Sequence, residues 1–325
     1  VFGLRGLPGS THPGLRALLE SANLLNEKLD AYHVGFRLAP RLNACGRMGH
    51  AQLAVELLTD ASESKCREIA RYLTQQNSER QKTEREITAA AVEMVRAQGL
   101  DRPENRAIVL ASEDWHGGVI GIVASRLVDR FHRPAILIAI NGDGTGQGSG
   151  RSIPGFDMHA ALNACGEHLL SFGGHAMAGG LRVAQDKIES FATAMAAHAA
   201  DAVADDSLVP AIQVDAEATL EQLHYQAVEH LQRLQPFGQG NPAPTVAIRG
   251  LRLLGPAKRM GRSGQTAGLL LGEGNTRMRA VGFGMGDLAD YLVGVNEVDV
   301  VAEPVLNHFN GRTSVELKLV DVAWE

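Results

Sequence analysis

Cysteine is scarce in this sequence, and its scarcity excludes two kinds of fold. Only three cysteines, Cys45, Cys66 and Cys165, occur among 325 residues, and they lie far apart. An odd number of widely spaced cysteines fits neither a disulfide framework nor a zinc cluster. We therefore expect three reduced thiols in a cytoplasmic protein.

Long apolar runs are also missing. The longest clean run, residues 135–140, is far shorter than the roughly 20 residues that a membrane-spanning helix needs. The first residues show no basic segment followed by an apolar one, so no secretory leader is visible. The sequence begins with Val1 rather than Met, which is compatible with a fragment. We expect no membrane partner.

The sequence has no net positive charge, although basic residues gather in one stretch. Its net charge is −6, which argues mildly against nucleic acid because nucleic-acid binding depends on Lys and Arg. Between residues 249 and 279, however, the local charge is +6, with Glu273 as the one acid. The seven basic residues are Arg249, Arg252, Lys258, Arg259, Arg262, Arg277 and Arg279. Screening limits the reach of each charge to about 8 Å at physiological salt, so we expect this stretch to bind single-stranded nucleic acid.

The pattern predicts three consecutive parts, of which residues 1–100 are helical. Short helices are expected first, with a loop over 39–50. A long connecting helix is then expected over 61–98, with Asp60 as its N-cap. No glycine or proline lies between Ala61 and Gln98, so nothing there breaks a helix. A helix this long and polar is typical of a connection between two domains.

Residues 101–203 are expected to form an α/β domain. Two apolar strands, 107–111 and 135–140, flank a helix over 118–131, which predicts a parallel pair with a right-handed crossover. A glycine-rich loop over 141–150 is expected next, and a helix over 158–170 after it.

A second glycine-rich turn is expected over 173–180, before a short strand over 181–183. Residues 204–325 then show five short strands, which is typical of a small β-barrel of the oligonucleotide-binding (OB) kind. These strands are expected at 245–253, 267–271, 277–283, 298–304 and 314–322, with a helix near 220–234. The predicted fold class is therefore α/β plus β-barrel.

Two arginines and an asparagine occur in the segment RLNACGRM, at Arg41, Asn43 and Arg47. A guanidinium presents a planar fork of donors that suits phosphate oxygens. The alternative is a surface loop with solvated arginines, which spacing alone favours because exposed arginines are common.

His116 follows a predicted strand and precedes a predicted helix, in the segment DWHGGVIG. Helix N-termini hold anions, and ligands of open α/β sheets gather at the ends of strands. The alternative is that His116 caps the helix or packs on Trp115.

Glycines at every second position precede Ser149, Arg151 and Ser152. Glycine lets the backbone approach a ligand closely, and the hydroxyls and the guanidinium suit a phosphate or a sugar. The alternative is a flexible hairpin tip.

His175 lies among glycines, with Gly173 and Gly174 directly before it. So little side-chain packing surrounds this histidine that we interpret it as a site residue rather than a structural one. Residues 236–244, with three prolines, are interpreted as a rigid turn without chemistry.

The segments RLNACGRM, DWHGGVIGIVASRL, GSGRS, FGGHAMAGG and PFGQGNPAP, in this order, resemble the RecJ family of single-stranded-DNA exonucleases over essentially all 325 residues. The resemblance implies a helical connector, an α/β substrate-binding domain that accompanies DHH phosphoesterase domains, and a C-terminal OB-fold. It also implies 5′-to-3′ removal of nucleotides in DNA repair and recombination.

The resemblance implies roles for the candidate residues. His175 would act at the scissile phosphate or its sugar, supporting charge as it develops. The expected phosphate and substrate ligands are Arg41, Asn43, Arg47, His116, Ser149, Arg151, Ser152, Gly173 and Gly174. The expected DNA contacts of the OB-fold are Lys258, Arg259, Arg262, Arg277 and Arg279. Expected partners are single-stranded DNA, single-strand-binding protein and a helicase, and the protein is expected to be a monomer.

The sequence departs from the family in its metal-binding motifs. It contains neither Asp-His-His nor Asp-x-Asp, whereas the family's catalytic domain binds two manganese or magnesium ions through such motifs. We therefore expect no metal ligand in this sequence and no nuclease activity from it alone. Two alternatives stay open: a non-catalytic single-stranded-DNA-binding fragment, and a DHH-family phosphodiesterase acting on short oligonucleotides or cyclic dinucleotides.

Overall fold

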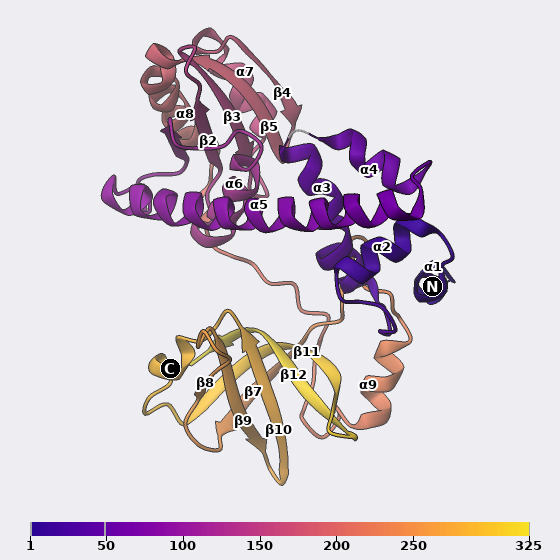
Figure 1. The fold of residues 1–325 in the computed structure, drawn as a ribbon. Helices are drawn as coiled ribbons and strands as arrows, with labels where there is room; N and C mark the ends of the chain where they lie inside the picture. Colours follow the sequence, from indigo (N-terminus) through magenta and orange to yellow (C-terminus); the bar gives the residue numbers. More distant parts are fainter. Residues whose placement is uncertain (1, 49, 325) are drawn as a thin grey trace. The chain divides into compact units, whose positions relative to one another are not determined.

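A computed structural model describes residues 2–48 and 50–324, and the chain divides into two units. One unit comprises residues 2–211 and the other residues 212–325 (Figure 1). The first unit contains the predicted helical and α/β parts together, and the second contains the predicted barrel. The contacts between residues divide the chain into two units and not three. The predicted boundary between the helical part and the α/β part therefore stays a prediction.

Short helices form the N-terminal part of the first unit. All but the exposed α1 pack around an apolar cluster that includes Leu18, Leu57 and Leu73. The elements are α1 (Phe2–Gly6), α2 (Pro13–Ser21), a π-helical turn η2 (His33–Leu38), α3 (Ala39–Met48) and α4 (Ala51–Leu58). The predicted loop over 39–50 is wrong, because α3 occupies most of it and buries Cys45 in this cluster.

The long helix α5 (Glu63–Ala97) confirms the predicted connecting helix. Its N-cap is Ser62, whose hydroxyl accepts a hydrogen bond from the Lys65 amide at 3.4 Å, and not the predicted Asp60. The N-terminal half packs among the short helices through Ile69, whereas the C-terminal half packs through Val95 on the α/β part. One helix thus joins two apolar cores within the first unit (Figure 1).

A mixed sheet with the strand order β1-β2-β3-β5-β4 forms the α/β part. Its strands are β1 (Ile108–Ser112), β2 (Ala135–Ile140), β3 (Thr145–Arg151), β4 (Ser171–His175) and β5 (Ala178–Ala184). The pair β1–β2 is parallel, as predicted, and the other pairs are antiparallel. Helices α5 and α6 (Ile120–Phe131) cover one face, and α7 (Met158–Ala164) and α8 (Ile188–Ala202) cover the other.

Most of both predicted glycine loops is strand, although residues 141–144 of the first do form a turn. Residues 145–151 form β3, and residues 173–180 lie in the hairpin of β4 and β5, whose turn is only Ala176 and Met177. In β3, glycine occurs at Gly146, Gly148 and Gly150 because neighbouring side chains pack where a Cβ would lie. The predicted helix over 158–170 ends at Ala164, since β4 begins at Ser171.

The second unit confirms the predicted OB-type barrel. Its strands are β6 (Ala216–Glu217), β7 (Val246–Leu253), β8 (Lys258–Met260), β9 (Thr266–Glu273), β10 (Thr276–Phe283), β11 (Glu297–Phe309) and β12 (Arg312–Ala323). Pairing between β7 and β9 closes the sheet around a core that includes Leu251, Leu271 and Leu317. Helix α9 (Tyr225–Gln232) is shorter than predicted, and the one-turn helix α10 (Leu288–Tyr291) precedes β11.

Candidate nucleic-acid interface

Strand β3 separates glycines and polar residues onto opposite faces. Gly146, Gly148 and Gly150 face the core between the sheet and α7 and α8. A Cβ at Gly148 would lie 2.6 Å from the Leu181 side chain, so only glycine fits there. Because successive side chains of a strand alternate, Ser149 and Arg151 point to the other face. The alternation of side chains along β3 therefore places its polar groups on the face opposite the glycines.

The first turn of α6 lies directly against those polar groups. A Cβ at Gly121 would lie 2.8 Å from the Ser149 hydroxyl and 3.0 Å from the Arg151 guanidinium. Glycine at this position therefore lets the helix N-terminus approach the strand. His116 lies in the turn before α6, where its Nδ1 accepts a hydrogen bond from the Gly118 amide at 3.0 Å. The N-cap of α6 is Val119, which forms no side-chain cap, so the alternative interpretation of His116 as the helix cap is not supported.

Arg47 enters the same place from the end of α3. Its guanidinium donates to the Gly118 carbonyl at 3.4 Å, and its own carbonyl lies 2.2 Å from where a Gly118 Cβ would be. Burial lowers the pKa of Arg151, and the nearby positive charge of Arg47 lowers it further. No acid of the described chain lies within 4 Å of either guanidinium. Two converging arginines without an acid, beside a helix N-terminus, favour an anion.

His175 shares a sheet face and a cross-strand row with Arg151. Arg151 pairs with Ala178, and Ala178 pairs with His175, so the three lie side by side across β3, β5 and β4. Directly opposed residues point to the same face, and two strand spacings amount to about 9.5 Å. His175 is exposed. The register therefore places the predicted catalytic histidine beside the predicted phosphate ligands.

The two candidate glycines before His175 differ in their surroundings. Gly174 has φ +148°, and a Cβ there would lie 2.3 Å from the Ala178 carbonyl, so the hairpin itself requires glycine. Gly173 has nothing within 4 Å of its Cβ position. It lies in the row of Ser149 and Gly180, on the face that holds Arg151.

Two other candidates, Arg41 and Ser152, lie outside this arrangement. Arg41 turns toward α5, where it donates to the Thr74 hydroxyl at 3.2 Å and to the Arg37 carbonyl. Its pKa is lowered by burial first and by Arg37 second. Ser152 is buried and donates to the Phe156 carbonyl at 2.6 Å, which fixes a turn. Asn43 is exposed on α3.

Sequence reasoning missed Gly121 and Gln147. Gln147 lies on the face of Ser149, and its side-chain oxygen lies 2.8 Å from where a Gly117 Cβ would be. The sequence pattern that could have identified Gln147 is the strict alternation of glycine with Gln147, Ser149 and Arg151. Such alternation is typical of a strand with two different faces and not of a loop.

The outer face of the barrel offers a second polar surface. A groove of about 380 Å³ lies over β8, β9 and β10, and its lining includes Lys258, Met260, Leu270 and Arg279. The Arg279 guanidinium donates to the Met260 sulfur at 3.5 Å. Phe283 is exposed further along β10. Basic groups interleaved with exposed apolar side chains are typical of surfaces that bind single strands.

Acids from outside the basic stretch neutralise part of it. Arg259 lies 2.5 Å from Asp290 and 2.9 Å from Asp287, and hydrogen bonds to these carboxylates raise its pKa. The other paired arginines are Arg249, with Glu217 and Asp299, and Arg279, with Glu316. Within the described chain, Arg252, Lys258, Arg262 and Arg277 form no ion pair. The local charge of +6 counted along the sequence therefore overstates the free positive charge.

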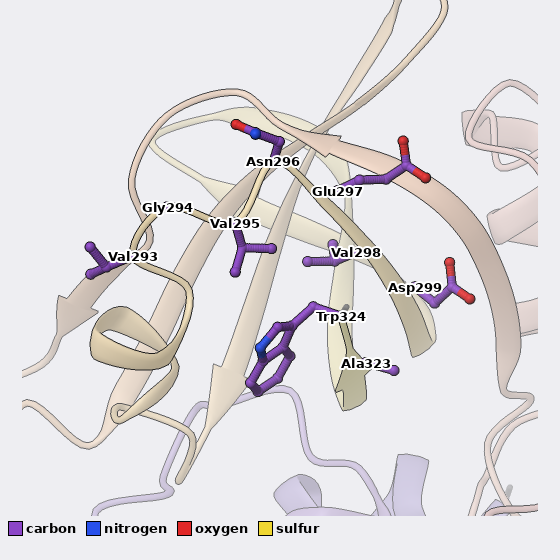
Figure 2. Close-up of a pocket in the computed structure, with 9 residues that line it drawn as sticks. All are labelled: Val293, Gly294, Val295, Asn296, Glu297, Val298, Asp299, Ala323 and Trp324. Atoms are coloured by element: carbon purple, nitrogen blue, oxygen red, sulfur yellow. The ribbon is translucent and has the colours of Figure 1, made fainter.

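A larger hollow of the barrel contains none of the predicted site residues. It has a volume of about 800 Å³ and lies at the start of β11 and the end of β12. Figure 2 shows Trp324 beside Val298, with the carboxylates of Glu297 and Asp299 on one side. Acids at its edge make this hollow unsuited to DNA phosphates.

The described residues also do not form a metal centre. Between residues 2 and 324, Gly49 apart, no three His, Cys, Asp or Glu side chains meet in a way that could hold an ion. Two-metal phosphodiester hydrolysis needs such a carboxylate cluster. No helix in the same range is both long and apolar enough to cross a membrane.

Comparison with known proteins assigns the α/β part and the barrel to two domain families. The profile of the DHHA1 domain matches residues 104–201, and that of the RecJ OB domain matches residues 214–321. The single-stranded-DNA-specific exonuclease RecJ of Bacillus subtilis is 34% identical over 99% of this chain and 41% of its own length. The protein of the same name from Dickeya dadantii is 33% identical over 97% of this chain and 55% of its own length.

Solved structures give the same result. The crystal structure of RecJ from Thermus thermophilus in complex with Mn²⁺ matches with a TM-score of 0.83 and 30% identity, over 99% of this chain and 46% of that chain. Its complex with Mg²⁺ matches with a TM-score of 0.80 and 28% identity. The chain thus spans about half the length of the relatives it matches. It belongs to the RecJ family and contains that family's DHHA1 and OB domains.

Proposed function

We propose that this chain is the DNA-binding part of a single-stranded-DNA-specific exonuclease, and that the cluster of Arg47, Ser149 and Arg151 binds a DNA phosphate. The observation that supports this most strongly is the approach of two arginines with no acid beside them. Charged donors hold a phosphate more strongly than neutral ones do. The N-terminus of α6 adds a positive dipole end at the same place.

His175 supports charge that develops at the phosphate undergoing cleavage. It shares the row of Arg151 across the sheet, so it lies within a nucleotide's reach of a phosphate bound there. Its exposure leaves the imidazole free to contact DNA. The chemistry of hydrolysis needs manganese or magnesium, as the names of the Thermus thermophilus complexes suggest. The described residues do not fit that pair of ions, so this chain supplies binding and orientation only.

The barrel holds the strand further along, through the groove over β8, β9 and β10. Lys258, Arg262 and Arg277 are basic groups of this region that form no ion pair in the described chain, whereas Arg259 is bound to two aspartates. The direction of degradation is 5′ to 3′. Single-strand-binding protein and a helicase supply the substrate strand in repair and recombination, and the chain acts as a monomer.

Binding to short single strands tests the proposal. We expect the 325-residue chain to bind a 5′-phosphorylated dT oligonucleotide more tightly than its 5′-hydroxyl counterpart. Arg151→Ala should weaken binding of the phosphorylated strand by about tenfold or more, because a hydrogen bond to a charged group contributes roughly 1.5–3 kcal/mol. Fluorescence anisotropy at fixed salt measures both.

Arg130→Ala is the matched control, because Arg130 is an exposed arginine on the last turn of α6. It should leave both affinities unchanged. Equal affinities for the two oligonucleotides, or an Arg151 variant that binds like the control, would show that the cluster does not bind a phosphate.

A further inference from the structure

A groove of about 430 Å³ continues the sheet face beyond the phosphate cluster, toward the β2–β3 turn. Its lining residues include Asn141, Gln147, Ser171 and Arg182. Gln147 pairs with Arg182, and Arg182 pairs with Ser171, so these three form the cross-strand row next to that of Ser149. We propose that this groove binds the base of the nucleotide whose phosphate is held by Ser149 and Arg151. This proposal rests on the function proposed above.

Two glycines without side chains form the floor of the groove, although the fold does not require glycine at either position. Gly180 lies between Ser149 and Gly173 in one row, and both glycines have φ values open to other residues. A Cβ at Gly173 would meet nothing within 4 Å, and at Gly180 only the Gly148 carbonyl at 3.9 Å. Neither packing nor backbone conformation requires glycine at these two positions. Because these two glycines lack side chains, their peptide planes are open to contact with a planar ring.

The polar side chains of the groove have their hydrogen-bonding capacity free. In the described part of the chain, the side chains of Gln147, Ser171 and Arg182 make no hydrogen bond. Amides and guanidinium groups are the side chains that read base edges, through paired donors and acceptors. The side-chain amide of Asn141 donates to the Thr145 hydroxyl at 3.3 Å, and in the described chain its side-chain oxygen accepts no hydrogen bond.

Charge favours a base over a second phosphate. Asp143 lies at the turn beside the groove, and its carboxylate accepts hydrogen bonds from the Thr145 hydroxyl at 2.6 Å and from the Thr145 amide at 3.0 Å. These bonds lower the pKa of Asp143, and Arg182 adds to the lowering. The carboxylate therefore stays ionised and offsets Arg182, in contrast to the arginine pair at the phosphate cluster. A neutral ring suits this balance better than a phosphate does.

The distance along the strand agrees with this assignment. Gln147 and Ser149 are two residues apart on β3, which is about 6.6 Å at 3.3 Å per residue. A phosphate at Ser149 therefore places its own base over Gly180 and within reach of Gln147. The amide of Gln147 lies beside Gly117, so it borders the helix side of the groove.

The test compares two 5′-phosphorylated dT trinucleotides on the 325-residue chain, one with its first base and one with an abasic first nucleotide. We expect the abasic probe to bind about fivefold more weakly, the low end of what a base contact contributes. Gly180→Val fills the groove and should reduce the affinity for the normal probe to that for the abasic one. Gly142→Val, at an exposed position with nothing within 4 Å, is the control and should keep the difference.

Gln147→Ala combined with Arg182→Ala is the second variant, because neither side chain supports the fold through a hydrogen bond. It should also bind the two probes equally. The proposal would be overturned if the unaltered chain bound the normal and the abasic trinucleotide with equal affinity. It would also be overturned if both altered chains kept the full difference in affinity between the two trinucleotides. Removing the 5′-phosphate separates the two ideas: if that change weakens binding while removing the base does not, only the base subsite fails.

Discussion

At the scale of single residues, glycine has two separable uses in this protein. Gly148 and Gly174 are glycine because a side chain would collide with the fold. Gly121 is glycine because a side chain would collide with Ser149 and Arg151, the residues of the phosphate cluster. Substitution of Gly148 should therefore lower mainly the stability of the fold, whereas substitution of Gly121 should weaken mainly the binding of phosphate.

Gly121→Ala should weaken phosphate binding more than it weakens the fold. Alanine in a helix gains roughly 1 kcal/mol over glycine, which offsets part of the collision. The methyl group still displaces the Ser149 hydroxyl and the Arg151 guanidinium. We expect several-fold weaker binding of a 5′-phosphorylated oligonucleotide, with a urea midpoint near that of the unaltered chain. A variant that binds normally would show that the contact with Gly121 is unimportant for the cluster.

Gly148→Ala should have the opposite effect. Its new methyl group meets Leu181 in the core, and overpacking of this kind costs about 1–3 kcal/mol. The free energy of unfolding in urea measures the loss, and Gly142→Ala is the control. An unchanged value for Gly148→Ala would contradict the placement of that residue against Leu181.

At the scale of elements, a buried ion pair within α5 is linked to α6 through an exposed arginine, Arg126. Glu84 is 7% exposed and accepts from the Arg80 guanidinium at 2.5 Å and from Arg126 of α6 at 2.8 Å. The Nε of Arg80 is buried without a partner in the described chain. Glu84 lies between Leu73 and Ile87, which belong to the two apolar clusters that α5 joins.

Glu84→Ala should therefore destabilise the fold strongly. Removing one partner of a buried pair typically costs about 3–5 kcal/mol, since the other charge is left without compensation. Glu86→Ala, an exposed carboxylate on the same helix, should change the stability by at most about 1 kcal/mol. Urea unfolding distinguishes them, and equal values would mean that the network contributes nothing beyond a surface pair.

The prediction of elements from sequence succeeded where apolar patterning was clear. The parallel strands, α5 and the five main strands of the barrel follow from runs and alternations of apolar residues. It failed at β3 and β4, because glycine usually marks turns. In β3, glycine instead makes room for Leu181 and other side chains of neighbouring elements, and in β4 Gly174 makes room for the backbone of β5. Arg41 and Ser152 could not be told from Arg47 and Ser149 by sequence, since residue type does not show which face a side chain takes.

At the scale of the whole molecule, charge counted along the chain differs from charge in space. Lys258 and Arg277 on the barrel have no acid within 4 Å among the described residues, whereas Arg259 has two. Changing Lys258 and Arg277 together to Ala should reduce the log–log salt slope for long oligo-dT by about 1.4, at roughly 0.7 per contact. Arg259→Ala should leave the slope nearly unchanged. A larger change for Arg259 would mean that DNA displaces its aspartates.

The central claim is that α3 and β3 hold one phosphate together, and a double-mutant cycle of Arg47 and Arg151 tests it most directly. Each arginine is changed to Ala alone and with the other, and binding of a 5′-phosphorylated dT trinucleotide is measured. If both contact one phosphate, the double variant loses less than the two single losses combined, with a coupling of about 0.5–3 kcal/mol. The coupling should vanish with the 5′-hydroxyl probe. Losses that simply add, and that are the same for both probes, would contradict a shared phosphate site.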